Sequence, residues 1–353
     1  MKSFRIALYP GDGIGPEVMA QAVRVLERVQ AQDGRFQLDL THLPWGADYY
    51  FQHGRVAPDD LLEQLRGFDA VLLGAVGDPQ RLPDHVTLAP LVRIRQSFDQ
   101  YACLRPCRLF PGVPSLLRHP HPIDLLILRE NSEGEYLVCG GRVRQGQAEE
   151  VAVQTAVHSR GGVERILRFG LKLALTRRRR LTMITKSNAL RYGMVLWDEM
   201  LEKVRGEFPE VETDRQHADA AAMDFVRRPQ RFDVVVASNL FGDILSDLGG
   251  AIIGGLGLAP SANLNPERTA PSMFEPVHGS APDIAGQGVA NPVAMILSSA
   301  MMLEWLGLRT AAEAIRTATE AALAGGAKTP DLGGTLTTAD MTDQIIKQLE
   351  EAK

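Results

Sequence analysis

Short apolar runs alternate with amphipathic segments over most of the chain. The runs are mostly apolar and suit strands that are buried on both faces of a sheet. They are Phe4–Tyr9, Asp69–Gly74, Ile123–Arg129, Leu181–Thr185 and Phe232–Ala237. Between them the spacing of apolar residues predicts helices, as in Val18–Val29 and Val163–Leu175. The alternation predicts an α/β architecture with much parallel sheet.

Two segments depart from this rhythm. Residues of about 134–158 are Gly-rich at first and then place apolar residues at every second position, which predicts a protruding hairpin or arm. Residues 254–291 are rich in Gly, Pro, Asn and Ala, and this segment is longer than a loop that only connects two elements. We expect a loop that carries binding there. Helical patterns return in 311–323 and 338–349.

Length, charge and cysteine content limit the kinds of protein that this chain can be. The 353 residues suffice for two core-forming domains. A formal net charge of −5 argues against a general nucleic-acid surface. The three cysteines, Cys103, Cys107 and Cys139, cannot all pair and lack the CxxC spacing of zinc or redox sites. Free thiols, no signal peptide and no apolar membrane span predict a cytoplasmic protein without a membrane partner.

Two aspartates, Asp243 and Asp247, follow the apolar run Val234–Val236. Residues four apart share a helix face, so these carboxylates converge and repel one another unless a hard divalent cation lies between them. A solvated helix face is the alternative. The interleaved apolar residues and Gly242, which permits close approach of another group, make the metal site an equal alternative to the solvated face. Asp219 could complete an oxygen-ligand set.

Three arginines, Arg95, Arg105 and Arg129, each lie beside a predicted strand or helix end. Guanidinium groups bind carboxylates well, and three of them could neutralise one buried acid, although each alone is more often a surface arginine. The run Arg177–Arg180, in contrast, predicts a helix end exposed to water, with no role in a site.

Tyr136 and Lys186 are candidates for proton transfer. Lys186 directly follows a predicted buried strand, where desolvation and nearby charge could lower the pKa of its amine enough for it to act as a general base. Either residue taken alone would be unremarkable.

Two Gly-rich segments are candidates for cofactor contacts. Gly11–Pro16 has GxGxG spacing with Pro16 in place of a third glycine, so we expect a tight strand-to-helix turn near a ligand, with phosphate binding as the alternative. The loop His278–Gly286, followed by Gly288 and Asn291, could wrap an adenosine. Asp283 would bind ribose hydroxyls and repel a 2′-phosphate, which predicts NAD over NADP.

These motifs together resemble the metal-dependent β-decarboxylating dehydrogenases, the family of 3-isopropylmalate, isocitrate, tartrate and D-malate dehydrogenases. The match runs over essentially the whole chain, through Gly11–Glu17, Leu104–Pro106, Asn239–Asp247 and His278–Pro282. The tartrate/D-malate branch is the most similar, on the patterns of Trp45–Tyr50, Pro83–Thr87, Phe98–Tyr101 and Arg129–Tyr136.

The resemblance implies a role for each candidate residue. Arg95, Arg105 and Arg129 would hold the substrate carboxylate that leaves as CO2. Asp243 and Asp247 would bind Mg²⁺ or Mn²⁺ together with Asp219 of a second subunit. Lys186, also from the neighbour, would assist removal of the hydroxyl proton, and Tyr136 would protonate the enolate carbon. The implied cofactors are NAD and the divalent metal, with K⁺ as a candidate monovalent ion. The implied NAD contacts are Asn188, His278, Gly279, Ser280, Ala281, Asp283, Ile284 and Asn291.

The implied fold is an isopropylmalate-dehydrogenase-like two-domain α/β fold with a large mixed or parallel sheet flanked by helices, and it is not a Rossmann domain. A discontinuous large domain, 1–101 plus 256–353, would carry most of the NAD site. A middle domain, 102–255, would carry the metal and substrate residues and an arm that builds a homodimer with shared active sites.

The expected reaction is NAD-dependent oxidative decarboxylation of a small 2-hydroxy dicarboxylate, namely D-malate to pyruvate and CO2, with tartrates as related substrates. One departure concerns substrate choice: Thr87-Leu88 is followed by Ala89-Pro90, where the branch usually has Trp-Gly. The alternative substrate is 3-isopropylmalate, whose isopropyl group could contact Leu88, Leu91 and Val92. Arg93 would face solvent or reach an extra anionic group. A non-catalytic regulatory subunit is the non-enzyme alternative, and the presence of the acids, Lys186 and Tyr136 argues against it.

Overall fold

The computed structural model describes residues 2–118 and 122–351, which form two compact units. The first unit comprises 2–100, 108–118 and 250–351, and the second comprises 101–107 and 122–249. The expected division assigned 108–118 to the other domain. This segment belongs to the first unit because Ser115 Oγ donates to the carbonyl of Ile252 at 2.7 Å and Arg108 pairs with Glu320 at 2.7 Å.

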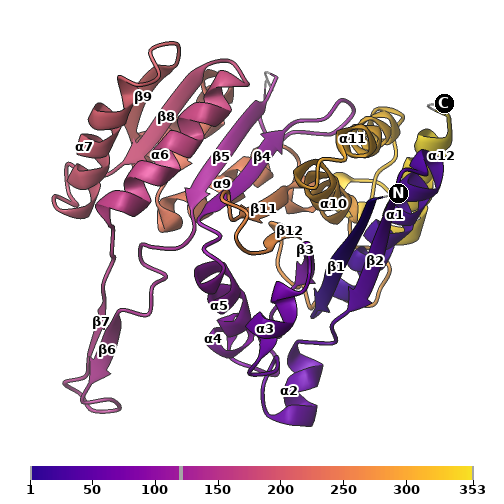
Figure 1. Ribbon diagram of the computed structural model, residues 1–353, viewed down its shortest axis with the longest axis horizontal. Coiled ribbons are helices and arrows are strands. Elements are labelled where there is room, and N and C mark those ends of the chain that lie inside the picture. The colour runs from indigo at the N-terminus through magenta and orange to yellow at the C-terminus, as the bar shows by residue number, and fades with distance from the viewer. Residues whose placement is uncertain (1, 119–121, 352–353) are drawn as a thin grey trace. The chain divides into compact units, whose positions relative to one another are not determined.

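The strands of the first unit follow the order β2-β1-β3-β12-β11 (Figure 1). Strand β1 is parallel to β2 and β3, β3 is parallel to β12, and β12 is antiparallel to β11. Every residue of β3 is buried, as expected for its continuous apolar run. The bounds are β1 (Lys2–Gly11), β2 (Phe36–His42), β3 (Ala70–Ala75), β11 (Pro260–Leu264) and β12 (Ser272–Pro276).

The segment 254–291 is only partly the loop that its composition predicts. It contains β11 and β12, and all residues of both strands are buried. Pro and Asn are poor strand formers. Here the Asn263 amide donates to the Glu275 carboxylate at 2.7 Å, so its burial does not leave this amide without a hydrogen bond. The stretch after Pro276 is free of helices and strands up to α10.

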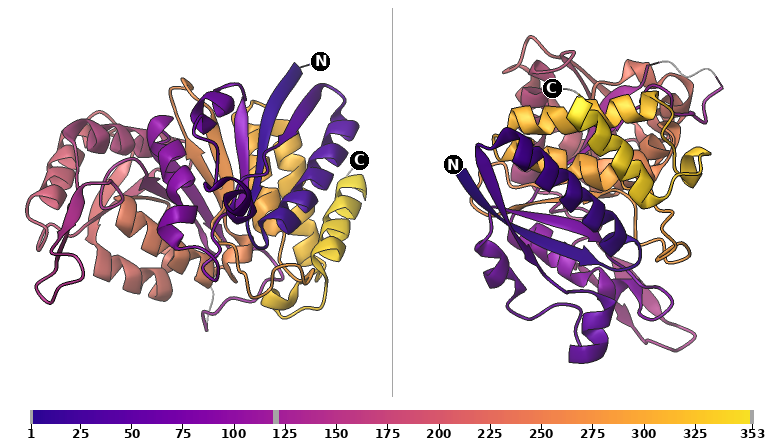
Figure 2. Two further views of the ribbon diagram at one scale, coloured as in Figure 1. Left: turned by 90° about the horizontal axis from the view of Figure 1, so that it is seen from below. Right: turned by 90° about the vertical axis from the view of Figure 1, so that its right-hand side faces the viewer.

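Helices pack on the strands of the first unit. Helix α10 is buried almost all round, since it contacts β11 and β12 and also the helices α1 and α11. Helices α1 and α12 lie side by side, which brings the two ends of the chain into one unit (Figures 1 and 2). The bounds are α1 (Gly15–Asp33), α2 (Ala47–His53), α3 (Leu61–Arg66), α4 (Asp84–Thr87), α5 (Ala89–Ser97), α10 (Val293–Trp305), α11 (Arg309–Ala324) and α12 (Thr338–Glu351), with short 3-10 helices at Leu256–Leu258 and Pro330–Leu332.

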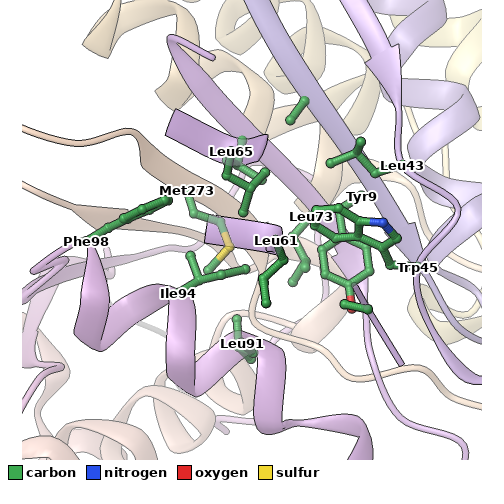
Figure 3. Packing of buried hydrophobic residues seen from close by; sticks show 13 residues of the cluster. Tyr9, Leu43, Trp45, Leu61, Leu65, Leu73, Leu91, Ile94, Phe98 and Met273 are labelled. Atoms are coloured by element: carbon green, nitrogen blue, oxygen red, sulfur yellow. The ribbon is translucent and has the colours of Figure 1, made fainter. Parts of the chain in front are cut away.

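A core of apolar side chains fixes α5, the helix that carries Arg95. Leu91 and Ile94 of α5 point toward side chains of α3, β3 and β12 (Figure 3). Leu91 is 8% exposed and Ile94 is fully buried. Burial of a Leu or Ile side chain contributes about 1.5–3 kcal/mol. The orientation of α5 is therefore set by packing within the first unit.

The strands of the second unit follow the order β4-β5-β10-β8-β9. The pairs β5/β10, β10/β8 and β8/β9 are parallel. Their carboxyl ends therefore meet at one edge, where ligands of open α/β sheets bind. The bounds are β4 (Ala102–Arg108), β5 (Asp124–Glu130), β8 (Arg180–Thr185), β9 (Glu212–His217) and β10 (Val234–Ala237).

Helix α6 packs closely on the strands of this unit. Ser159 caps its first turn by accepting the Gly162 N–H at 2.9 Å. A Cβ at Gly170 would lie 2.6 Å from the Val236 side chain, so only glycine permits this approach to β10. The bounds are α6 (Arg160–Leu175), α7 (Gly193–Arg205), α8 (Ala218–Arg227) and α9 (Asn239–Ile252), with a 3-10 helix at Pro229–Arg231.

The segment expected to form an arm is a hairpin of β6 (Gly140–Val143) and β7 (Val151–Gln154), and it extends away from α6 and α7 (Figure 1). All residues of both strands are exposed. Among the described residues, no helix has both the length and the apolar character needed to cross a membrane.

The arginine run follows the end of α6, and Arg178–Arg180 are exposed, as expected, whereas Arg177 is half-buried. Arg177 pairs with the buried Asp233 at 2.8 Å and with Asp124 at 2.9 Å. Arg180 begins β8 and pairs with Glu212 of β9 at 2.9 Å. The run joins the strand ends opposite the predicted site, because the acids that it meets precede or begin these strands.

Candidate active site

The carboxyl ends of β5 and β10 bring Arg129 next to helix α9. Ala237, the last residue of β10, is opposite Arg129 in the strand register, and α9 begins two residues later. A Cβ at Gly242 would lie 2.7 Å from the Arg129 side chain. Gly242 therefore permits the close approach that the sequence suggested.

Asp243 accepts hydrogen bonds from three of the predicted site residues. Its Oδ1 lies 3.0 Å from Arg105 Nη1 and 2.5 Å from Arg129 Nη1, and its Oδ2 accepts the Tyr136 hydroxyl at 2.9 Å. Both arginines are nearly buried, with 6% and 3% of their surface exposed. Buried guanidinium groups need anionic partners, so this cluster is built to hold negative charge.

Asp247 lies one turn further along α9, with its side chain 58% exposed and Oδ1 3.9 Å from Arg105 Nη1. Desolvation raises the pKa of Asp247, and the charge of Asp243 adds to this rise while Arg105 opposes it. A cation between Asp243 and Asp247 would relieve the repulsion. The two carboxylates therefore fit an oxygen-preferring divalent ion.

Tyr136 lies at the start of the arm and contacts this cluster. Partial burial raises the pKa of its phenol, and the neighbouring Asp243 raises it further. The Arg129 guanidinium lies 5.3 Å from the centre of the Tyr136 ring. The hydroxyl is therefore protonated at neutral pH and can donate a proton.

Lys186 and Asp219 form a separate pair in the same unit. Lys186 follows β8 and Asp219 lies in the first turn of α8, and Lys186 Nζ is 2.7 Å from Asp219 Oδ1. The hydrogen bond from Lys186 lowers the pKa of Asp219, which is 68% exposed. Within residues 2–118 and 122–351, no three His, Cys, Asp or Glu side chains are grouped to hold a metal. One chain thus does not gather Asp219 with Asp243 and Asp247.

Sequence reasoning missed Asn239, although it read the motif that contains it. Asn239 Oδ1 accepts Arg129 Nε at 3.0 Å and Nη2 at 2.7 Å, and its amide donates to the carbonyl of Glu133 at 2.8 Å. This arrangement leaves Arg129 Nη1 directed at Asp243. Asparagine after a buried strand is not by itself a signal for such a role.

Arg95 belongs to the first unit, where its guanidinium pairs with the buried Glu275 of β12. Glu275 was not predicted as a site residue, because it lies within the segment that was expected to be a loop. Arg93 is exposed, in agreement with the expectation that it faces solvent, and its Nη2 donates to the carbonyl of Asp59 at 3.0 Å. The side chain of Leu91 is buried in the core described above.

The loop after β12 holds most of the predicted NAD contacts and rests on the Gly-rich turn. Ile14 N–H donates to the Ser280 carbonyl at 2.8 Å, and a Cβ at Gly13 would lie 2.0 Å from the same oxygen. Pro16 lies in the first turn of α1, as expected. A cleft of about 390 Å³ adjoins this loop and is lined in part by Gly13, Pro282 and Gly286.

The predicted cofactor residues differ in their own contacts. His278 Nε2 is buried without a hydrogen-bond partner in the described part of the chain, and burial lowers the pKa of the imidazole. Asn291 Oδ1 accepts Val293 N–H at 3.1 Å and so anchors the start of α10. Asp283 is exposed, and Asn188 is exposed in the turn after β8 of the second unit. The buried, unpaired Nε2 of His278 is consistent with a ligand near this loop.

Comparison with known proteins agrees with this geometry. A family model described as isocitrate/isopropylmalate dehydrogenase matches residues 5–345. D-malate dehydrogenase (decarboxylating) of Escherichia coli strain K12 is 52% identical, with 98% of this chain and 99% of that protein aligned. Tartrate dehydrogenase/decarboxylase of Pseudomonas putida is 50% identical, with 98% of each aligned.

The solved structures include an isocitrate dehydrogenase from Methylococcus capsulatus, with a TM-score of 0.88 and 36% identity over 98% of this chain and 99% of that chain. The expected fold, a mixed sheet flanked by helices, is thereby confirmed. The relatives support a decarboxylating dehydrogenase activity. The chain belongs to the isocitrate/isopropylmalate dehydrogenase family.

Proposed function

We propose that this protein catalyses the NAD-dependent oxidative decarboxylation of D-malate to pyruvate and CO2, with tartrates as related substrates. The observation that carries the proposal is the convergence of Arg105, Arg129 and Tyr136 on Asp243. Relatives named D-malate dehydrogenase and tartrate dehydrogenase, about half identical over the full chain, support the choice of substrate.

The arginines account for recognition of a dicarboxylate. Arg105 and Arg129 are almost fully buried, and the Nη1 atoms of both lie within 3.0 Å of Asp243 Oδ1. Together with Arg95 they would hold the carboxylate that leaves. The positive charge of the arginines holds the leaving carboxylate in place and so orients the substrate, including the C3–C4 bond that must break.

Asp243 and Asp247, with Asp219 of a second copy, would hold Mg²⁺ or Mn²⁺. When bound, such an ion supplies a Lewis acid for the hydroxyl and carbonyl oxygens of the substrate. Carboxylate oxygens are the ligands that both ions prefer. Because Asp219 and Asp243 do not group within one chain, we propose a homodimer in which each active site takes Lys186 and Asp219 from the partner.

Two side chains, Lys186 and Tyr136, carry out the proton transfers. Lys186 assists removal of the hydroxyl proton while a hydride passes from C2 to NAD⁺, which gives a 2-oxo acid and NADH. The C3–C4 bond breaks next, CO2 leaves, and its electron pair forms an enolate. Tyr136 protonates C3 of this enolate to give pyruvate, and solvent restores the phenol proton.

The exposed Asp283 carboxylate supports NAD as the cofactor, since it would repel a 2′-phosphate. His278 and the backbone from Gly279 to Ala281, with Ile284 and Asn291, would contact the adenosine side, and Asn188 the nicotinamide side. Cys107 and Cys139 are free thiols, which favours the reducing cytoplasm as the place of action.

The alternative substrate 3-isopropylmalate loses part of its support. Leu91 was expected to contact the isopropyl group, but it is 8% exposed and packs in the core of the first unit. Of the other two residues of that proposed contact, Val92 is half-buried and Leu88 is 38% exposed. The apolar contact proposed for the isopropyl group is therefore reduced to these two side chains.

A comparison of initial rates tests the proposal. D-malate, L-tartrate, meso-tartrate, 3-isopropylmalate and isocitrate are each supplied with Mn²⁺ or Mg²⁺ and with either NAD⁺ or NADP⁺, and formation of the reduced cofactor is followed. We expect the highest kcat/KM with D-malate and NAD⁺. A clear preference for 3-isopropylmalate, or no turnover of any substrate, would contradict the proposal.

A further inference from the structure

Asp198 of helix α7 binds both chain neighbours of Lys186. Thr185 Oγ1 donates to Asp198 Oδ1 at 2.7 Å, and Ser187 Oγ donates to Asp198 Oδ2 at 2.7 Å. The Asp198 side chain is only 12% exposed. Ser187 N–H also donates to Thr185 Oγ1 at 3.3 Å. The turn that carries Lys186 is thus fixed on both sides by one carboxylate.

The same carboxylate is bound to the neighbouring strand. Arg215 Nη1 of β9 donates to Asp198 Oδ2 at 2.6 Å, and β9 ends at His217, just before α8 and Asp219. Strands β8 and β9 are paired up to Thr185 and His217. Asp198 therefore connects the segment that presents Lys186 with the segment that presents Asp219.

We propose that Asp198 is a positioning residue, which holds the Lys186 amine and the Asp219 carboxylate in register for the hydroxyl-proton and metal-binding roles given to them above. The inference rests on the proposed function and deepens it. Hydrogen bonds to a charged group are stronger than those between neutral groups, so this anchor is firm. A base misplaced by about 1 Å can lose about a hundredfold in rate, so loss of this anchor acts on the chemical step.

Three variants test the proposal: Asp198→Ala removes the anchor, Asp198→Asn keeps one carbonyl oxygen as acceptor, and Ser187→Ala removes a single donor. For Asp198→Ala we expect kcat with the preferred substrate to fall about tenfold or more while KM stays within about twofold, because the arginines that bind the carboxylate are untouched. Asp198→Asn should recover part of the loss. Ser187→Ala, the mildest change, should lower kcat about threefold.

Asp224→Ala is the matched control. Asp224 of α8 is also a nearly buried carboxylate with three hydrogen-bond partners, Gln216, Arg228 and Arg231, and none of these is a chain neighbour of Lys186. This variant loses a comparable network, so a general loss of packing would lower its kcat as well. We expect a kcat close to that of the unaltered protein.

Hydrogen–deuterium exchange of the peptide that contains 185–190 gives a readout that does not need activity. Exchange should be faster in Asp198→Ala than in Asp224→Ala or the unaltered protein. An unchanged kcat in Asp198→Ala, an equal fall in the control, or unchanged exchange would overturn the proposal. If the unaltered protein oxidises none of the five substrates, the proposed function fails, and exchange still shows whether Asp198 orders this turn.

Discussion

Two groups of side chains in the second unit differ in how complete they are. The Asp243 group consists of Arg105, Arg129, Tyr136 and Asp243, in which two nearly buried guanidinium groups and a phenol meet one carboxylate. The Lys186 group consists of Lys186 and Asp219, a single ion pair of 2.7 Å whose acid is 68% exposed. The first is assembled within the chain, whereas the second leaves its charges open to solvent.

In these two groups, charged side chains are buried only where an opposite charge neutralises them. The arginines are buried because Asp243 neutralises them, and an unpaired buried charge would be costly. The exposed ion pair contributes little to stability, because solvent and salt screen its charges. Lys186 and Asp219 are therefore not held together for the stability of one chain, which supports their proposed service in the active site of a second copy.

The largest effect is expected from Asp243→Asn, which removes the charge at the centre of the Asp243 group. Turnover should fall by about a thousandfold or more, since the change leaves two buried guanidinium groups facing a neutral amide and weakens metal binding. The measurement is kcat with excess Mn²⁺, alongside circular dichroism. Asp343→Asn, which alters an exposed aspartate paired with Arg24, serves as control. A near-normal rate for Asp243→Asn with added metal would contradict the assignment.

Mixing two inactive variants tests whether the groups come from different chains. Asp243→Asn and Lys186→Ala each lack one group, but a hybrid dimer contains one site with both groups intact. Random pairing gives about half hybrids with one working site of two, so about a quarter of the normal activity should return. Mass-tagged chains verify that hybrids form. Hybrids without activity would show that both groups serve the same chain.

Much of the fold could be predicted because its central strands are apolar throughout. β1, β3, β5, β8 and β10 were expected from their apolar runs and are present. β9 was missed, since Glu212–His217 is polar along its whole length. Its side chains are satisfied by pairs that no local pattern reveals, such as Arg215 with Asp198 and Arg231 with Asp214. Tertiary contacts override the local propensity there.

The candidate site likewise contains residues that the sequence predicted and residues that it did not. Charged residues next to strand ends were recognisable, because the carboxyl ends of parallel strands meet at one edge. The residues that orient them were not. Asn239 lies 110 positions from Arg129, and Glu275 lies 180 positions from Arg95. Such partners are set by the packing of distant segments, and a single sequence carries no signal for them.

Asn239→Ala weakens the support of Arg129 in the Asp243 group without removing a charge. Arg129 would lose the two hydrogen bonds that Asn239 Oδ1 accepts. We expect KM for the 2-hydroxy acid to rise about tenfold, which corresponds to about 1.4 kcal/mol of lost orientation. KM for NAD⁺ should change by less than about twofold. Asn239→Asp, which keeps an acceptor oxygen, is the conservative control, and an unchanged KM in Asn239→Ala would show that Arg129 needs no such support.

The smallest effect concerns the stability of the helix that presents Asp219. The hydrogen bond from Arg228, with those from Gln216 and Arg231, lowers the pKa of Asp224 on α8 to about 2. Because the folded pKa lies below the ordinary value of 3.8, the charged carboxylate stabilises the folded state above about pH 4, and this stabilisation fades as the pH falls toward 2. The difference in free energy of unfolding between the unaltered protein and Asp224→Asn should therefore be largest at neutral pH and shrink below pH 4. Urea unfolding at several pH values measures it. The kcat at neutral pH should hardly change, since the hydrogen-bond partners of Asp224 are Gln216, Arg228 and Arg231, and not Lys186 or Asp219.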